Sequence, residues 1–224
     1  MPGRAKHSVI MFVVVALLST PHPVHAQSSP QDTKVEASQN EIGIFGVIPL
    51  ANGSLEGVTS DRRFFMFGFS YSRVLWNSHA CSIRWVSEIM PLELLREPFD
   101  PATNAQTLRM LPFTKEKFTY GMGTNPVGAD LVFRPSHRWR PYVGAHGGFS
   151  YFTRNVLASH AAQFNFMLDG RAGLRFSLPG AQSLSGAYVF QHMSNAYTAI
   201  ANPGVDSHMI QIVYNFPLRF GKVK

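Results

Sequence analysis

Hydrophobic and polar residues alternate along most of this chain beyond residue 40. The clearest stretch is residues 164–178, where Phe164, Phe166 and Leu168 share one parity while Asp169 and Arg171 share the other. A period of two with one apolar and one charged face predicts a β-strand. The stretch is long for a soluble strand but suits a tilted strand that crosses a membrane and extends beyond it.

The same alternation predicts seven further strands, and an even number of antiparallel strands can close into a barrel without an exposed edge. Thr124, Asn125 and Pro126 interrupt one of them, so we expect a bulge or a break there. The sequence thus predicts an all-β protein, an eight-stranded antiparallel transmembrane β-barrel. The other seven predicted strands are residues 41–50, 64–74, 81–90, 118–134, 141–152, 184–194 and 206–216.

The predicted connections alternate between short turns and longer loops, which is typical of barrels in the bacterial outer membrane. A lipocalin-like soluble barrel or a β-sandwich would place the apolar face inward, and this chain carries too many large aromatic residues for a small lumen. Eight strands also leave no wide channel, which argues against a porin. The short turns are 76–79, 135–138 and 179–182, and the longer loops are 50–63, 91–117, 155–162 and 195–205.

The first residues have the composition of an export signal. Arg4, Lys6 and His7 precede an apolar run at residues 9–18, and Val24-His25-Ala26 resembles a cleavage site. The alternative, a membrane anchor, would need a longer apolar run. We therefore expect an exported protein of the outer membrane. Its predicted organisation is a signal peptide at 1–26, a flexible periplasmic segment at 27–40 and the barrel at 41–224.

The formal net charge of the full chain is +7. Such an excess suits contact with an anionic surface such as phosphorylated lipid, or simply reflects solvated loops.

The single Cys81 excludes an internal disulfide and a zinc site made of cysteine clusters. We expect no cofactor, no metal and no nucleic-acid partner. The sequence leaves the oligomeric state open, a homodimer included.

Two reactive residues end the predicted strand 184–194. His192 and Ser194 continue the parity of Tyr188 and Phe190, which should face lipid. Polar groups that face lipid are costly and usually functional. The pair therefore becomes a candidate base and nucleophile.

An acidic residue begins the next predicted strand on the same outward parity. If the loop 195–205 folds symmetrically, His192 lies directly opposite Asp206, and the carboxylate can orient the imidazole while Ser194 sits two residues along. A register slip of one residue would turn one partner inward. His208 shares the outward parity and is a rival base, but it has no outward serine two residues away.

The residues around this predicted hairpin form a pattern. His192-Met193-Ser194-Asn195-Ala196, followed by Asn202-Pro203-Gly204-Val205-Asp206, resembles the PagL-type lipid A 3-O-deacylases, a family of eight-stranded outer-membrane acyl hydrolases. The detailed resemblance covers residues 190–216, and upstream only the length and the strand pattern agree. It implies that Ser194 is the nucleophile, His192 the general base, Asp206 the orienting acid and Asn195 an oxyanion-stabilising side chain.

Two departures from the family pattern are visible. Asp206 stands where glutamate is typical, so the backbone must approach the histidine more closely. Tyr197 stands where glycine is typical, which puts a backbone oxyanion donor from that point in doubt.

The resemblance also implies the substrate, lipid A of lipopolysaccharide among the lipids of the outer membrane, attacked at its 3-O-acyl ester. The alternatives are an outer-membrane phospholipase and a non-enzymatic structural or adhesive barrel. Six cations of the predicted outer loops could meet lipid A phosphates. They are Arg62, Arg63, Arg96, Arg109, Lys115 and Lys117.

Overall fold

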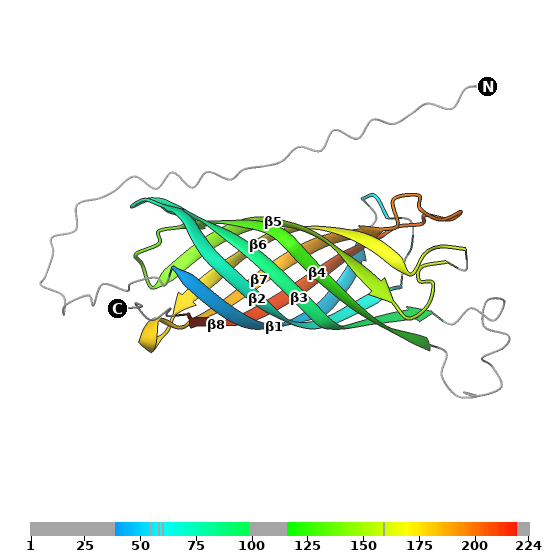
Figure 1. Ribbon diagram of the computed structural model, residues 1–224, viewed down its shortest axis with the longest axis horizontal. Helices are drawn as coiled ribbons and strands as arrows, with labels where there is room; N and C mark the ends of the chain where they lie inside the picture. Colours follow the sequence, from blue (N-terminus) through cyan, green and yellow to red (C-terminus); the bar gives the residue numbers. More distant parts are fainter. Residues whose placement is uncertain are drawn as a thin grey trace, which may run out of the picture. The chain divides into compact units, whose positions relative to one another are not determined.

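The computed structural model describes residues 39–53, 55–57, 59, 61–98, 116–158 and 160–218. Its eight strands follow one another around a closed antiparallel barrel, in which β8 pairs with β1 (Figure 1). A short 3-10 helix, Pro179–Ala181, connects β6 to β7. No helix among these residues is long and apolar enough to cross a membrane. The strands are β1 Asn40–Gly53, β2 Arg63–Asn77, β3 Cys81–Pro98, β4 Glu116–Phe133, β5 Trp139–Phe152, β6 Phe164–Ser177, β7 Ser183–Ser194 and β8 Val205–Pro217.

This architecture confirms the predicted fold class and the order of the strands. The expected irregularity in β4 is also present, because its register with β5 shifts between Thr124 and Val127. Proline lacks the N–H that a regular ladder needs, so Pro126 is tolerated at such a shift.

The prediction of a long loop at 91–117 was wrong in its bounds. β3 continues through Pro91 to Pro98, and β4 begins at Glu116. The register with β4 shifts between Met90 and Glu93, so Pro91 lies at an irregularity and does not end the strand. Arg96 and Lys117 therefore lie in strands, near the end of the β3–β4 ladder.

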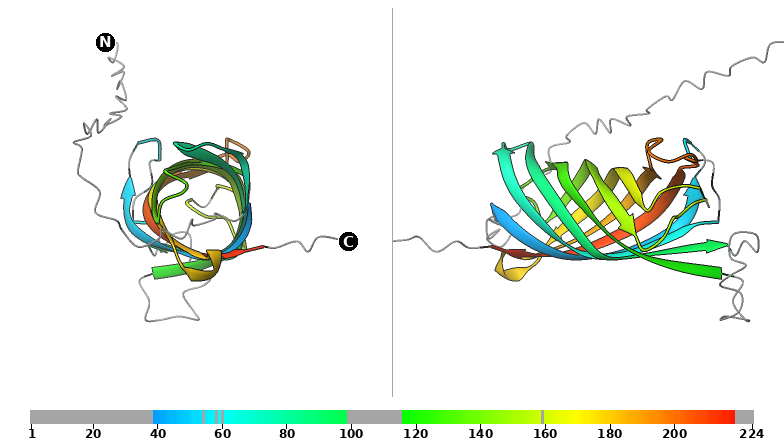
Figure 2. Two further views of the ribbon diagram at one scale, coloured as in Figure 1. Left: turned by 90° about the vertical axis from the view of Figure 1, so that its left-hand side faces the viewer. Right: turned by 45° about the vertical axis from the view of Figure 1, so that its right-hand side comes forward.

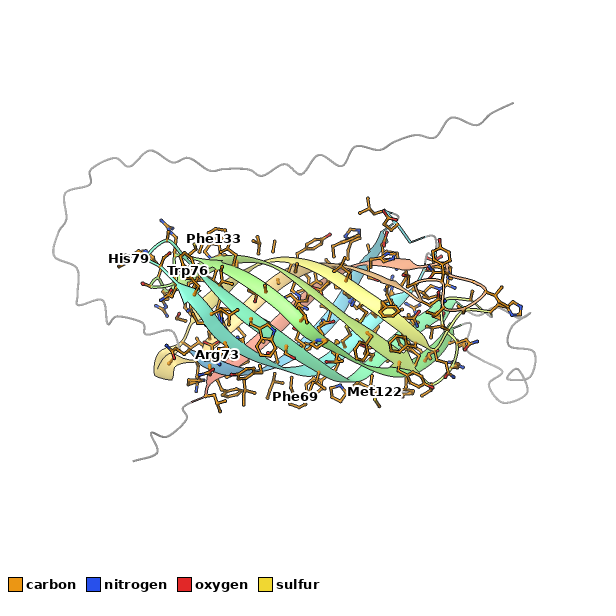
Figure 3. The ribbon with its side chains drawn as sticks, turned by 45° about the horizontal axis from the view of Figure 1, so that its top comes forward. Phe69, Arg73, Trp76, His79, Met122 and Phe133 are labelled. Atoms are coloured by element: carbon orange, nitrogen blue, oxygen red, sulfur yellow. The ribbon has the colours of Figure 1, made fainter. Side chains whose placement is uncertain are left out.

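The outer surface of the barrel is apolar, as the parity predicted. Phe69 in β2 is 44% exposed and Met122 in β4 is 62% exposed, and both lie on the outer surface (Figure 3). The neighbouring residues on the other parity, such as Ser70, are buried in the lumen. An apolar outer face with a polar inner face is the arrangement that lipid imposes on a membrane barrel.

A polar network fills the middle of the lumen. Arg171 donates to both oxygens of Glu88, at 2.7 and 2.6 Å, and to Asp169 at 2.6 Å. Gln211 donates to Glu88 at 3.0 Å. These groups are almost fully buried, so each charge depends on its partner and not on water.

Apolar side chains close the lumen at the end where the long loops lie. Phe64, Leu95 and Phe152 are fully buried there, and Val156 and Leu157 of the β5–β6 loop are also buried among them. The left view of Figure 2 shows the ring of strands from the end opposite the long loops. Two cavities beside the polar network in the middle of the lumen measure about 30 and 10 Å³, room for isolated waters and not for a channel.

The two ends of the barrel differ. We call the end with the β1–β2, β3–β4, β5–β6 and β7–β8 connections the long-loop end, and the other, where β1 starts and β8 ends, the short-turn end (Figure 1). The predicted signal peptide at 1–26 and nearly all of the segment 27–40 lie outside the described residues, as do Arg109 and Lys115.

Candidate active site

The imidazole of His192 and the carboxylate of Asp206 meet on the outer face of the barrel at the long-loop end. The two residues are directly opposed across the β7–β8 ladder, which confirms the predicted register. His192 Nδ1 lies 2.7 Å from Asp206 Oδ1. When Nδ1 carries the proton and donates it to the carboxylate, Nε2 is left as an acceptor, which is the form a general base needs.

The shorter acid therefore reaches the imidazole. Asp206 is completely buried although its parity faces outward, whereas the His192 side chain is 29% exposed. The imidazole is accessible from the outer face, and the carboxylate behind it is shielded.

The β1–β2 loop covers the carboxylate. The backbone N–H groups of Leu55, Glu56 and Gly57 donate to Asp206 Oδ2 at 2.6, 2.7 and 3.0 Å. Charge-assisted bonds of this kind stabilise an ionised carboxylate strongly where water is excluded. Oδ1 is left to the imidazole, so both oxygens of the acid are engaged.

Gly57 permits this close approach. A Cβ at this position would stand 2.6 Å from the backbone nitrogen of Asp206 and 2.7 Å from the Cα of Val205. Real Cβ atoms essentially never make contacts under 3.0 Å, so a side chain here would push the loop away. The sequence interpretation missed this role. Its only signal was a glycine-containing loop, about 150 residues from the acid it covers.

Ser194 is the last residue of β7 and pairs with Phe166 of β6. It is half-buried and lies on the same outward parity as His192. No hydrogen bond among the described residues joins its hydroxyl to the imidazole. Catalytic contacts of this kind are often loose without substrate and form when a side chain changes rotamer.

The β7–β8 loop returns the chain to the histidine. Gly204 has a φ of +59°, and a Cβ on it would lie 3.2 Å from His192 Cε1. Its carbonyl accepts a hydrogen bond from the Thr59 backbone N–H at 3.3 Å and another from the Thr59 hydroxyl. The β1–β2 and β7–β8 loops are therefore bonded to each other beside the imidazole.

Asn195 lies in this loop and is 1% exposed. Its Nδ2 donates to the carbonyl of Ala201 at 2.7 Å, and its Oδ1 accepts from the N–H of Tyr197 at 3.0 Å. The amide thus shapes the loop. An oxyanion role for this side chain stays a prediction, and the Tyr197 N–H is already engaged.

Tyr197 has a φ of +61°, in the left-handed region that glycine enters without strain. The side chain is 84% exposed. The backbone at this position therefore has the left-handed conformation that favours glycine.

The rival base is already engaged. His208 pairs opposite Phe190, and its Nδ1 is hydrogen-bonded to the hydroxyl of Tyr188. No carboxylate is hydrogen-bonded to it within the described part of the chain. His192 is the imidazole on this face that has an acid partner.

The described members of the six predicted outer cations differ in their surroundings. Arg62 donates to the carbonyl of Leu157 at 3.1 Å and lies 3.8 Å from Glu97. It therefore links the β1–β2 loop to the β5–β6 loop and to the end of β3. Arg63 is exposed at the start of β2, while Arg96 and Lys117 are half-buried. No cluster of His, Cys, Asp or Glu that would hold a metal ion occurs among the residues placed in the structure.

A solved structure with a TM-score above 0.5 supports the fold. The crystal structure of the outer membrane enzyme PagL is 17% identical, covers 79% of this chain and 99% of its own, and has a TM-score of 0.55. Neisserial surface protein A is 12% identical over 81% of this chain and 98% of its own, with a TM-score of 0.48. The N-terminal β-barrel domain of Pseudomonas aeruginosa OprF is 15% identical over 80% and 98%, with a TM-score of 0.41. No curated protein sequence matches the chain.

Comparison with protein families is more specific. The family described as lipid A 3-O-deacylase (PagL) matches residues 67–215, a span that contains His192, Ser194 and Asp206. Together with the closed eight-stranded barrel, this match shows that the chain is an outer-membrane protein and belongs to the lipid A 3-O-deacylase (PagL) family.

Proposed function

We propose that this barrel is a serine esterase that removes the 3-O-linked acyl chain from lipid A in the outer leaflet of the outer membrane. The observation that carries the proposal is the bond between His192 and the buried Asp206, on the outer face and two residues from Ser194. A base, an orienting acid and a hydroxyl on one face are the components of nucleophilic acyl transfer.

In the first half-reaction, Ser194 Oγ attacks the carbonyl carbon of the ester while His192 Nε2 takes the hydroxyl proton. The imidazolium is stabilised by Asp206, which remains ionised. The tetrahedral intermediate then collapses, and the imidazolium returns the proton to the departing sugar oxygen. This step leaves an acyl-enzyme and a free hydroxyl on the sugar.

In the second half-reaction, a water molecule replaces the sugar. His192 Nε2 removes a proton from the water as its oxygen attacks the acyl-enzyme, and the proton then passes to Ser194 Oγ as that bond breaks. The products are a fatty acid and the original serine. The reaction needs water at the site, which suits an imidazole that is partly exposed near the end of the strand.

The proposed oxyanion donor is the side-chain amide of Asn195. After donating to Ala201, the Asn195 amide keeps one further hydrogen, but the side chain is buried in the loop. We retain Asn195 as the proposed oxyanion residue and expect its loop-shaping bonds to matter as well.

The position of the site supports lipid A as the substrate. Outer-membrane barrels have short periplasmic turns and long external loops, so the long-loop end faces outward. Lipid A occupies the outer leaflet, and a site on the lipid-facing surface at that end can attack an acyl ester without extracting the lipid. Arg63, exposed at the same end, is our candidate for contact with a lipid A phosphate.

Mass spectrometry of lipid A and phospholipids after expression in a suitable host tests the proposal. Wild type should produce lipid A that has lost one 3-O-acyl chain, and Ser194→Ala should leave lipid A intact while the barrel still folds. Intact lipid A with accumulating lysophospholipid would favour a phospholipase. Equal lipid A profiles for wild type and Ser194→Ala would favour a structural or adhesive barrel.

A further inference from the structure

A second polar site lies at the short-turn end of the lumen, far along the strands from the His192–Asp206 pair. It is a cavity of about 80 Å³ lined by three arginines from three different strands. We call it the arginine cavity. Its polar lining consists of Arg84 in β3, Arg140 in β5, Arg175 in β6, Gln39, Asn77 and Ser82.

One carboxylate partly balances these cations. Glu41 Oε2 accepts a hydrogen bond from Arg84 Nη2 at 2.9 Å and another from Arg175 Nη2. Asp130 also interacts electrostatically with Arg84, but its Oδ1 is hydrogen-bonded to His146 Nε2 at 3.0 Å. The cluster of three guanidinium groups around Glu41 therefore carries an excess of positive charge.

Arg140 is the least compensated of the three arginines. The residue is only 3% exposed, and its Nε is buried with no hydrogen-bond partner among the described residues. Glu41 acts on Arg140 through its charge, but the buried Nε–H of Arg140 has no acceptor, and a buried donor without an acceptor is unfavourable. An anionic acceptor between Arg140 and the other two arginines would provide that partner.

We propose that the arginine cavity binds a tetrahedral oxyanion, the phosphate group. Guanidinium groups bind phosphate through paired N–H donors, and three of them can surround its oxygens. A volume of about 80 Å³ exceeds what a single water needs, which is about 10–15 Å³. The phosphate comes from one of two sources, the free inorganic ion or the headgroup of a phospholipid at that end of the barrel.

A ligand that binds only the folded barrel raises its melting temperature. The thermal unfolding of the full-length barrel, purified in a phosphate-free detergent, should shift upward by several degrees as inorganic phosphate is added at constant pH and ionic strength. The shift should saturate. A parallel titration with a short-chain phosphatidylglycerol, kept below its micelle concentration, distinguishes the lipid source, because only the source that fits will stabilise at micromolar to low millimolar levels.

Two arginine variants make the assay specific. Arg140→Gln should remove the phosphate-dependent shift in melting temperature. Arg140→Lys should weaken that shift, because lysine keeps the charge but lacks the paired N–H donors of the guanidinium. Arg138→Gln is the matched control, since Arg138 is exposed two residues away with its guanidinium over the Phe176 ring. Ser194→Ala should respond like wild type, which separates this site from the proposed esterase.

The result that would overturn the proposal is a wild-type barrel with no saturable shift in either titration. The same conclusion follows if Arg140→Gln responds as strongly as Arg138→Gln. If Arg140→Gln fails to fold, Arg140→Lys with unchanged phosphate response is sufficient to reject the site. Titration calorimetry should find one phosphate per folded wild-type chain.

Discussion

Replacing Asp206 by asparagine tests the proposed acid, because the change keeps the shape of the side chain while it removes the charge and exchanges one acceptor oxygen for an NH₂ donor. The carboxylate accepts four hydrogen bonds, one from His192 Nδ1 and three from the β1–β2 loop. An amide has a single acceptor oxygen and an NH₂ group that only donates. In Asp206→Asn, the NH₂ group must therefore face either the imidazole or the three backbone N–H groups of the loop.

The two orientations fail differently. If the amide oxygen faces the loop, the NH₂ group faces the imidazole and favours the tautomer with the proton on Nε2, which cannot accept the serine proton. If the oxygen faces the imidazole, three backbone N–H groups lose their acceptor. Water cannot compensate, because Asp206 is completely buried.

The same change at the acid of a serine protease lowers kcat by about 10⁴. Because this acid is shielded from water, we expect Asp206→Asn to lower kcat by about 10³ to 10⁴ with little change in KM. Asp206→Glu restores the residue typical of the family, but the added methylene moves the carboxylate by about 1.5 Å toward the loop backbone. We expect a loss of only about tenfold, since a short loop shift can absorb it.

The assay is release of fatty acid from lipid A in mixed micelles, with kcat and KM determined separately. Heat-modifiable migration on gels verifies that each variant is folded, and Asp61→Asn, an exposed change in the same loop, serves as the control. If Asp206→Asn turns over within about threefold of wild type, another group orients His192 and the proposed triad is wrong.

Four further variants probe the surroundings. Gly57→Ala should lower kcat by about ten- to a hundredfold, because the loop must move, whereas Gly46→Ala, with open space around it, should match wild type in the same assay. Asn195→Ala should reduce both the melting temperature and turnover; a loss of about 10²–10³ in kcat at unchanged melting temperature would instead indicate a pure oxyanion role. His208→Phe should keep most of the activity, and a loss as large as that of removing the proposed base would reverse the assignment of the two histidines. Arg171→Met should lower the free energy of unfolding by about 3–5 kcal/mol in urea titrations, because two buried carboxylates lose their partner, and an unchanged midpoint would contradict that account of the lumen.

The sequence could predict the barrel because period-two patterning assigns each side chain to one face. The residues that alternate in β6, such as Leu168 and Asp169, are exposed and buried as their parity requires. The opposition of His192 and Asp206 was also predictable, because a loop that joins neighbouring strands fixes their register.

Pro91 shows where local patterning is insufficient. A proline normally weakens a strand, so the sequence suggested that β3 ends at residue 90. The pairing with β4 continues beyond it because the register shifts there and the missing N–H is not needed. Whether a proline ends a strand depends on the partner strand, which a single-sequence pattern does not describe.

The β1–β2 loop covers Asp206 through contacts between residues that are far apart in the sequence. Leu55, Glu56 and Gly57 lie about 150 positions before Asp206, and they bind it through backbone N–H groups that almost any residue type could supply. Only Gly57 is dictated by its surroundings. Nearly every residue type carries a backbone N–H group, so the sequence does not indicate which of these groups bind Asp206. Only the structure shows this part of the site.

The β1–β2 loop that covers Asp206 also explains how this carboxylate can occupy a lipid-facing position. A carboxylate exposed to hydrocarbon would take up a proton and could no longer stabilise the imidazolium. Here the imidazole binds one oxygen and three amides bind the other, so the charge is retained without water. Each set of bonds depends on the other, because the loop fixes the carboxylate that orients His192. We expect a shorter acid to be adequate under these conditions, since the loop approaches it closely at Gly57. The aspartate at position 206, where glutamate is typical of the family, and the close approach of the β1–β2 loop at Gly57 therefore belong to one arrangement.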